Sequence, residues 1–134
     1  MYTEDGFELR PVGDTMEIFA SGEMFHETRP PVIAAFQALA ERVSATKVLC
    51  DVRMAAYILD ADELEVRARI TSRALLPYKT AFVCLANQRD LLGRTAQNIR
   101  EHGGDAALFS NKSDARDWLA GRSVSDDALK SVSA

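Results

Sequence analysis

The chain has 134 residues, of which 47% are apolar and 27% are charged, and its formal net charge is −4. This length can bury a core without disulfides or metals, so we expect one domain over residues 1–120 and a frayed tail over 121–134. The net negative charge argues against nucleic acid as a partner. The apolar runs are too short for a membrane span, and the polar first residues do not fit a secretory signal, so we expect a cytoplasmic location.

The first part of the chain predicts a β-hairpin followed by a helix. Residues 7–11 and 16–20 alternate apolar with polar side chains around a short turn, which is typical of two antiparallel strands with one buried face. Pro30 and Pro31 are tolerated only in the first turn of a helix, and the apolar spacing that follows them predicts a helix over residues 30–44.

The remainder of the chain alternates short strands with amphipathic helices. Nearly continuous apolar runs predict buried parallel strands over 47–52, 80–86 and 106–109. Apolar residues at helical spacing predict helices over 61–75 and 88–102, and a last helix that Ser110 or Ser113 caps and that ends at Gly121. The order β-β-α-β-α-β-α-β-α predicts an α/β fold with a mixed, mainly parallel sheet flanked by helices.

The segment from Arg53 to Asp60 is longer than most strand-to-helix connections. Loops of unusual length are often functional or mobile, so we interpret this segment as a loop that takes part in binding.

Few residues in the chain are candidates for chemistry. Cys50 and Cys84 lie in apolar runs and are predicted to be buried, and no spacing of cysteine and histidine fits a metal site. His102 ends a helix and is expected to contact its terminal carbonyl groups. His26 is the better candidate for a general base, but no nucleophile can be assigned to it. We therefore expect no enzyme activity, metal or cofactor.

The order of the elements, together with the closing Leu108-Phe-Ser and Ala115-x-x-Trp118-Leu119, resembles the STAS-like superfamily, which has the fold of anti-sigma-factor antagonists. More narrowly, residues 5–120 resemble the stand-alone bacterial STAS/SEC14-like domains. In that superfamily an acidic residue ends the central strand, and an Asp-Ser-Ser segment opens the next helix, where a partner kinase phosphorylates one serine.

Asp51 matches the strand-end acid of the superfamily, but Ala61 and Asp62 occupy the entrance of the next helix, where neither can accept a phosphate. The resemblance therefore implies a domain of this fold without the phosphoacceptor serine. Asp62 is most simply a helix cap, and the other interpretation is a fixed negative charge that mimics the phosphorylated state.

The leading functional hypothesis is a non-enzymatic regulatory module that binds a protein partner through the strand-end loops and the start of the 61–75 helix. Its expected contact residues combine one aromatic anchor with charged and amide groups: Asp51, Arg53, Tyr57, Asp60, Asp62, Asn87 and Arg89. Exposed edge strands leave a homo-oligomer open as well.

The alternative hypothesis takes the SEC14-like resemblance further and expects a small apolar or lipid ligand between the sheet and the helices. Its expected contacts are the apolar residues of the long connection: Met54, Tyr57, Ile58 and Leu59. An enzyme of unrecognised type is a third hypothesis.

Overall fold

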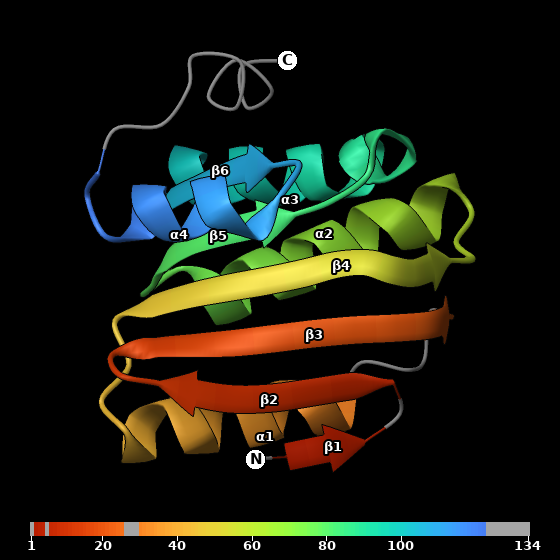
Figure 1. Ribbon diagram of the computed structural model, residues 1–134. Coiled ribbons are helices and arrows are strands. Elements are labelled where there is room, and N and C mark those ends of the chain that lie inside the picture. Colours follow the sequence, from red (N-terminus) through yellow and green to blue (C-terminus); the bar gives the residue numbers. More distant parts are fainter. Residues whose placement is uncertain (1, 5, 26–29, 123–134) are drawn as a thin grey trace.

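The structure is built on a β-sheet whose strands lie side by side in the order of the sequence (Figure 1). The computed structural model describes residues 2–4, 6–25 and 30–122, and within these residues the sheet has six strands and the chain has four α-helices. The strands are β1 (Tyr2–Glu4), β2 (Phe7–Val12), β3 (Thr15–Met24), β4 (Lys47–Tyr57), β5 (Lys79–Val83) and β6 (Asp105–Phe109). The helices are α1 (Pro30–Arg42), α2 (Ala61–Leu75), the 3₁₀ turn η1 (Ala86–Gln88), α3 (Arg89–Glu101) and α4 (Lys112–Leu119).

The sheet is mixed, as predicted. The strand β2 is antiparallel to both of its neighbours, β1 and β3, whereas β3, β4, β5 and β6 run parallel to one another. The predicted hairpin is β2–β3, with Val12 paired to Thr15 and the turn made by Gly13, whose φ of 61° favours glycine. The short edge strand β1 was not expected from the sequence. The predicted tail lies outside the described residues from position 123 onward.

The two faces of the sheet carry cores of different size. The helices α1, α2 and α3 lie behind the sheet in Figure 1 and cover the larger core, whereas α4 lies in front and covers a smaller one over β4, β5 and β6. Alternation along each strand sorts the side chains between these faces. In β5, Phe82 packs in the larger core and Val83 in the smaller one.

The connection predicted as a loop over residues 53–60 is mostly β-strand, so that prediction is wrong. The strand β4 continues to Tyr57 beside an equally extended β3, with Met54 paired to Ser21 and Tyr57 paired to Met24. Between Asp51 and Met54, β4 has one residue more than β3, which is a β-bulge. The bulge interrupts the alternation of buried and exposed side chains, and this interruption concealed the strand in the sequence.

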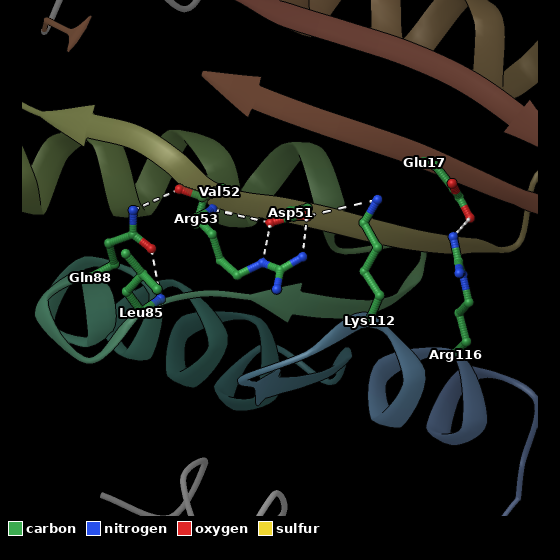
Figure 2. Close-up of polar contacts among 8 residues, drawn as sticks. All are labelled: Glu17, Asp51, Val52, Arg53, Leu85, Gln88, Lys112 and Arg116. Atoms are coloured by element: carbon green, nitrogen blue, oxygen red, sulfur yellow. Dashed lines mark hydrogen bonds and ion pairs between the residues drawn. The ribbon is translucent and has the colours of Figure 1, made fainter. Parts of the chain in front are cut away.

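The side chain of Gln88 holds the extended part of β4 in place. In the described residues β5 pairs with β4 only as far as Asp51, so the carbonyl groups beyond that point have no neighbouring strand on this side. The Gln88 Nε2 donates to the Val52 carbonyl oxygen at 2.6 Å, and its Oε1 accepts from the Leu85 N–H at 2.8 Å (Figure 2). The same Nε2 also donates to the Ala55 carbonyl oxygen at 2.8 Å. One buried amide therefore satisfies three backbone groups beside the bulge.

Side chains cap the starts of two helices. The helix α2 begins with a capping box in which the Asp60 carboxylate accepts from the Glu63 N–H at 2.8 Å and the Glu63 carboxylate accepts from the Asp60 N–H at 3.0 Å. The helix α4 is capped by Asn111, not by Ser110 or Ser113 as predicted. None of the helices that the structure describes is long and apolar enough to cross a bilayer.

Replacing Gln88 tests whether this amide fixes the end of β4. Gln88→Leu leaves the carbonyl groups of Val52 and Ala55 and the N–H of Leu85 without their partner, and should lower the free energy of unfolding by about 2–4 kcal/mol. Urea denaturation measures this change, and amide hydrogen exchange at Ile58 should accelerate. The matched control is Asn87→Leu in the same turn, which is exposed and should change stability by less than about 0.5 kcal/mol. Equal effects of the two variants would contradict the role of Gln88.

Candidate functional site

The parallel strands end at one edge of the sheet, and this edge is the candidate site. The strands β3 and β4 end together at Met24 and Tyr57, where the Ile58 N–H donates to the Met24 carbonyl oxygen at 2.9 Å. The strand β5 ends earlier, at Val83, and η1 brings the chain back beside the extended β4. Ligands and partners of open α/β sheets usually bind beyond the carboxyl ends of the strands.

Large apolar side chains are exposed along this edge. Among the described residues, five large hydrophobic side chains are exposed; three of them follow the parallel strands β3, β4 and β5, and a fourth lies in the part of β4 that extends beyond β5. We call these four the carboxyl-edge patch: Phe25 (41% exposed), Met54 (66%), Ile58 (46%) and Leu85 (46%). The fifth, Val12 (47% exposed), ends β2 beside the β2–β3 turn, away from this edge.

Polar residues of the predicted partner site flank the carboxyl-edge patch. Asp60 is exposed and caps α2, so the structure assigns the cap to Asp60 and places Asp62 as an exposed acid in the first turn. Asn87 lies exposed in η1, and Arg89 is exposed at the start of α3. These four residues from the predicted set lie at the starts of the helices that follow β4 and β5.

Asp51 is not at the strand end, because β4 continues for six residues beyond it. Asp51 is 2% exposed, and its carboxylate binds Arg53: the Arg53 Nε donates to Oδ1 and the Arg53 Nη2 donates to Oδ2, both at 3.0 Å (Figure 2). The Arg53 N–H also donates to it, at 3.1 Å, and Lys112 Nζ lies 3.8 Å away. With the ion pair from Arg116 to Glu17 of β3 at 3.3 Å, the Lys112–Asp51 pair ties α4 to the sheet.

The charges around Asp51 keep its carboxylate ionised. Burial acts to raise the pKa of Asp51, but hydrogen bonds from the Arg53 side chain and backbone, together with the charges of Arg53 and Lys112, outweigh burial and lower the pKa below its ordinary value. Asp51 and Arg53 therefore form a structural ion pair under α4, and the Arg53 side chain is 34% exposed beside it.

Tyr57 lies on the other face of the sheet from Asp51. Its ring packs against the larger core, and the guanidinium carbon of Arg67 lies 5.3 Å from the ring centre. The predicted partner residues therefore do not form one patch. The bulge in β4 turns Tyr57 toward the core, while Asp51 and Arg53 face α4.

The predicted ligand residues are also distributed over several places. Met54 and Ile58 belong to the exposed carboxyl-edge patch, Leu59 packs at the margin of the larger core, and Tyr57 lines a cavity. The sequence identified this segment, but the bulge was not expected, so its side chains could not be assigned to the two faces of the sheet.

The cavity lies between the larger core face of the sheet and the helices that cover it, and it has a volume of about 90 Å³. Its walls come from elements far apart in the sequence, including Phe7 of β2, Phe36 of α1, Arg67 of α2 and Leu91 of α3. The alternative hypothesis expected a ligand between the sheet and the helices, but of its four residues only Tyr57 is among the lining residues. The others could not be identified from the sequence, because each apolar lining residue has the spacing of an ordinary core residue.

Two cysteines and one histidine that could take part in chemistry lie in the described part of the chain. Burial, followed by the charges of Asp51 and Cys84, raises the pKa of Cys50 to about 12, and burial also raises the pKa of Cys84. The His102 Nδ1 lies 2.8 Å from the Asn98 carbonyl oxygen, as expected for a structural histidine at a helix end. His26 lies outside the described residues. Those residues contain no group of three or more metal-binding side chains.

The ion pair of Asp51 predicts a pH-dependent contribution to stability. Because the folded-state pKa lies below the ordinary 3.8, the contribution is present above that value and is lost as the pH falls through the folded-state pKa. Asp51→Asn should lower the free energy of unfolding by about 2–4 kcal/mol at pH 7, and the gap to the unmodified protein should shrink below pH 4.

Urea denaturation of both proteins across pH 2–7 measures this gap. The control Asp62→Asn removes an exposed carboxylate and should change stability by less than about 0.5 kcal/mol throughout. A gap for Asp51→Asn that does not change with pH would refute the ion-pair explanation.

Comparison with known proteins gives the fold. No protein-family model and no curated protein matches the chain. The chain is similar to the crystal structure of an uncharacterized protein of the DUF3478 family with a SpoIIAA-like fold from Shewanella loihica PV-4, with a TM-score of 0.55 and 19% sequence identity. The likeness covers 89% of this chain and 98% of that one. At this identity it establishes the fold alone, and it confirms the expected one: the chain has a SpoIIAA-like, STAS-like fold.

Proposed function

We propose that this protein is a non-enzymatic regulatory module that binds a protein partner through the carboxyl-edge patch. The observation that carries the proposal is the concentration of exposed large hydrophobic side chains, four of the five in the described residues, at the edge where the parallel strands end. Exposed apolar side chains flanked by polar residues are typical of protein interaction sites.

The residues around the patch supply selectivity. Asp62 at the start of α2 and Arg89 at the start of α3 are exposed charges of opposite sign, and Asn87 adds an amide between them in the sequence. Such charges orient a partner and exclude wrong ones, while apolar anchors such as Met54 and Leu85 provide most of the binding energy.

The residues at the start of α2 favour a partner interaction that is not regulated by serine phosphorylation at this position. Ala61 and Asp62 follow the cap Asp60, and neither accepts a phosphate. Asp62 keeps a permanent negative charge where a phosphoserine would carry one, so the module presents a constant surface to its partner.

The test uses two exposed hydrophobic residues at opposite ends of the sheet. A photoreactive amino acid at position 85 should cross-link the partner in extracts of the source cells, whereas the same residue at position 12 should not. With the recovered partner, Leu85→Asp should weaken binding at least tenfold in isothermal titration calorimetry, because a charge replaces an apolar anchor.

Val12→Asp is the matched control, since Val12 and Leu85 are almost equally exposed. It should leave the dissociation constant unchanged, and both variants should keep the melting temperature of the unmodified protein. Loss of binding in both variants, or in neither, would count against the patch.

A second candidate function is the binding of a small apolar molecule, and the cavity of about 90 Å³ under α1 and α2 favours it. Most of its lining is aliphatic or aromatic, with Phe7, Phe36 and Phe82 among the largest groups. Ligand sites in proteins are usually concave and mostly apolar, with a few polar groups that fix the orientation of the ligand.

A further inference from the structure

A groove of about 180 Å³ lies between the carboxyl-terminal halves of α2 and α3, which pack side by side behind the sheet (Figure 1). The helix α2 leads to the start of β5 and α3 leads to the start of β6, so the groove lies at the edge of the sheet opposite to the carboxyl-edge patch. Its lining residues come from both helices and their ends: Arg69, Ser72, Arg73, Leu76, Asn98 and His102. The groove shares no lining residue with the apolar cavity.

Two arginine side chains in the groove form no ion pair or side-chain hydrogen bond with any residue that the structure describes. Arg69 and Arg73 are exposed and four residues apart, so they lie on the same face of α2. Glu65, one turn before Arg69, instead pairs with Arg94 of α3 at 3.2 Å. Like charges at this spacing repel each other, so an anion bound between them would relieve the repulsion.

The side of the groove formed by α3 adds a hydrogen-bonding group. Asn98 is half-buried, and its side-chain amide forms no hydrogen bond within the described part of the chain, so its two N–H groups can donate to a ligand. The Ser72 hydroxyl is already engaged, because it lies 2.5 Å from the Ala68 carbonyl oxygen and 3.1 Å from the Thr95 carbonyl oxygen. The His102 Nδ1 contacts the Asn98 carbonyl oxygen at 2.8 Å, which holds the imidazole ring at the end of the groove.

The charge of the groove is positive even though two helices end there. The carboxyl end of a helix carries a partial negative charge equivalent to about half a unit. The full charges of Arg69 and Arg73 exceed the sum for α2 and α3 by about one unit. Glu101 does not line the groove, and its carboxylate accepts from the Gln97 Nε2 at 3.0 Å. The groove is therefore suited to an anion.

We propose that this groove binds a small molecule with a phosphate monoester group on an apolar body of about the size of a benzene ring. A phosphate monoester carries close to two negative charges at neutral pH and three acceptor oxygens, which matches two guanidinium groups better than the single charge of a carboxylate does. The apolar body lies against Leu76 and the hydrocarbon stems of the two arginines. A cavity of about 150 Å³ holds benzene, so a groove of about 180 Å³ has room for a ring.

The experiment titrates the protein with phenyl phosphate at constant ionic strength and about pH 7.5, observed by NMR. The side-chain amide signals of Asn98 and the ring signals of His102 should shift and saturate, whereas the amide signal of Ile58 at the opposite edge should not shift. Benzoate has one charge and should bind about tenfold more weakly. Inorganic phosphate lacks the ring and should bind about fivefold more weakly, and phenol should give no saturable shift.

Two variants with a matched control locate the site. Arg69→Gln and Arg73→Gln should each weaken phenyl phosphate binding about tenfold, because each removes one charged donor from the groove. Arg42→Gln removes an equally exposed class of arginine from the last turn of α1 and should leave the affinity unchanged. All three side chains are exposed, so the variants should keep the melting temperature of the unmodified protein.

Three outcomes would overturn the phosphate site. The first is the absence of a saturable shift with phenyl phosphate. The second is equal weakening in Arg42→Gln, which would show that anions are attracted to surface arginines in general. The third is binding of phenol as tight as that of phenyl phosphate, which would show an apolar groove without selection for the phosphate.

Discussion

The bulge in β4, held by Gln88, is the constraint on which the rest of the structure depends. Without it, the side chains beyond Val52 would keep the earlier alternation, and Tyr57 would face α4 instead of the larger core. Because β5 pairs with β4 only as far as Asp51, carbonyl groups near the bulge have no strand partner on that side, and the buried Gln88 amide supplies their hydrogen bonds. The same side chain bonds to Leu85, so it also positions η1 and the start of α3.

This arrangement separates a buried ion pair from an exposed apolar residue, although the two are close in the sequence. Asp51 and Arg53, before and within the bulge, form an ion pair that Lys112 joins from α4. Ile58, after the bulge, reaches the edge as an exposed apolar residue. The ion pair and the exposed Ile58 therefore lie at different positions along one strand and its continuation, and a substitution of Ile58 need not disturb the ion pair.

The sequence predicted those parts of the fold that depend on local patterns. The bounds of α2 follow from its acidic start and from Pro77, and the order of strands and helices follows from hydrophobic periodicity. The end of β4 was missed because the bulge reverses which alternate residues face the larger core, so the strand does not show one regular alternation of apolar and polar residues. Most of the residues that line the cavity were missed, because the cavity arises from incomplete packing among distant elements and spacing along the chain contains no information on that packing.

The cavity and the carboxyl edge are joined through Arg67. Its guanidinium group lines the cavity, contacts the Tyr57 ring and bonds to the carbonyl oxygen of Phe25, a member of the carboxyl-edge patch. A shift of this guanidinium group would therefore change the cavity wall and the backbone of the carboxyl edge together, so one side chain links two parts of the molecule that are far apart in the sequence.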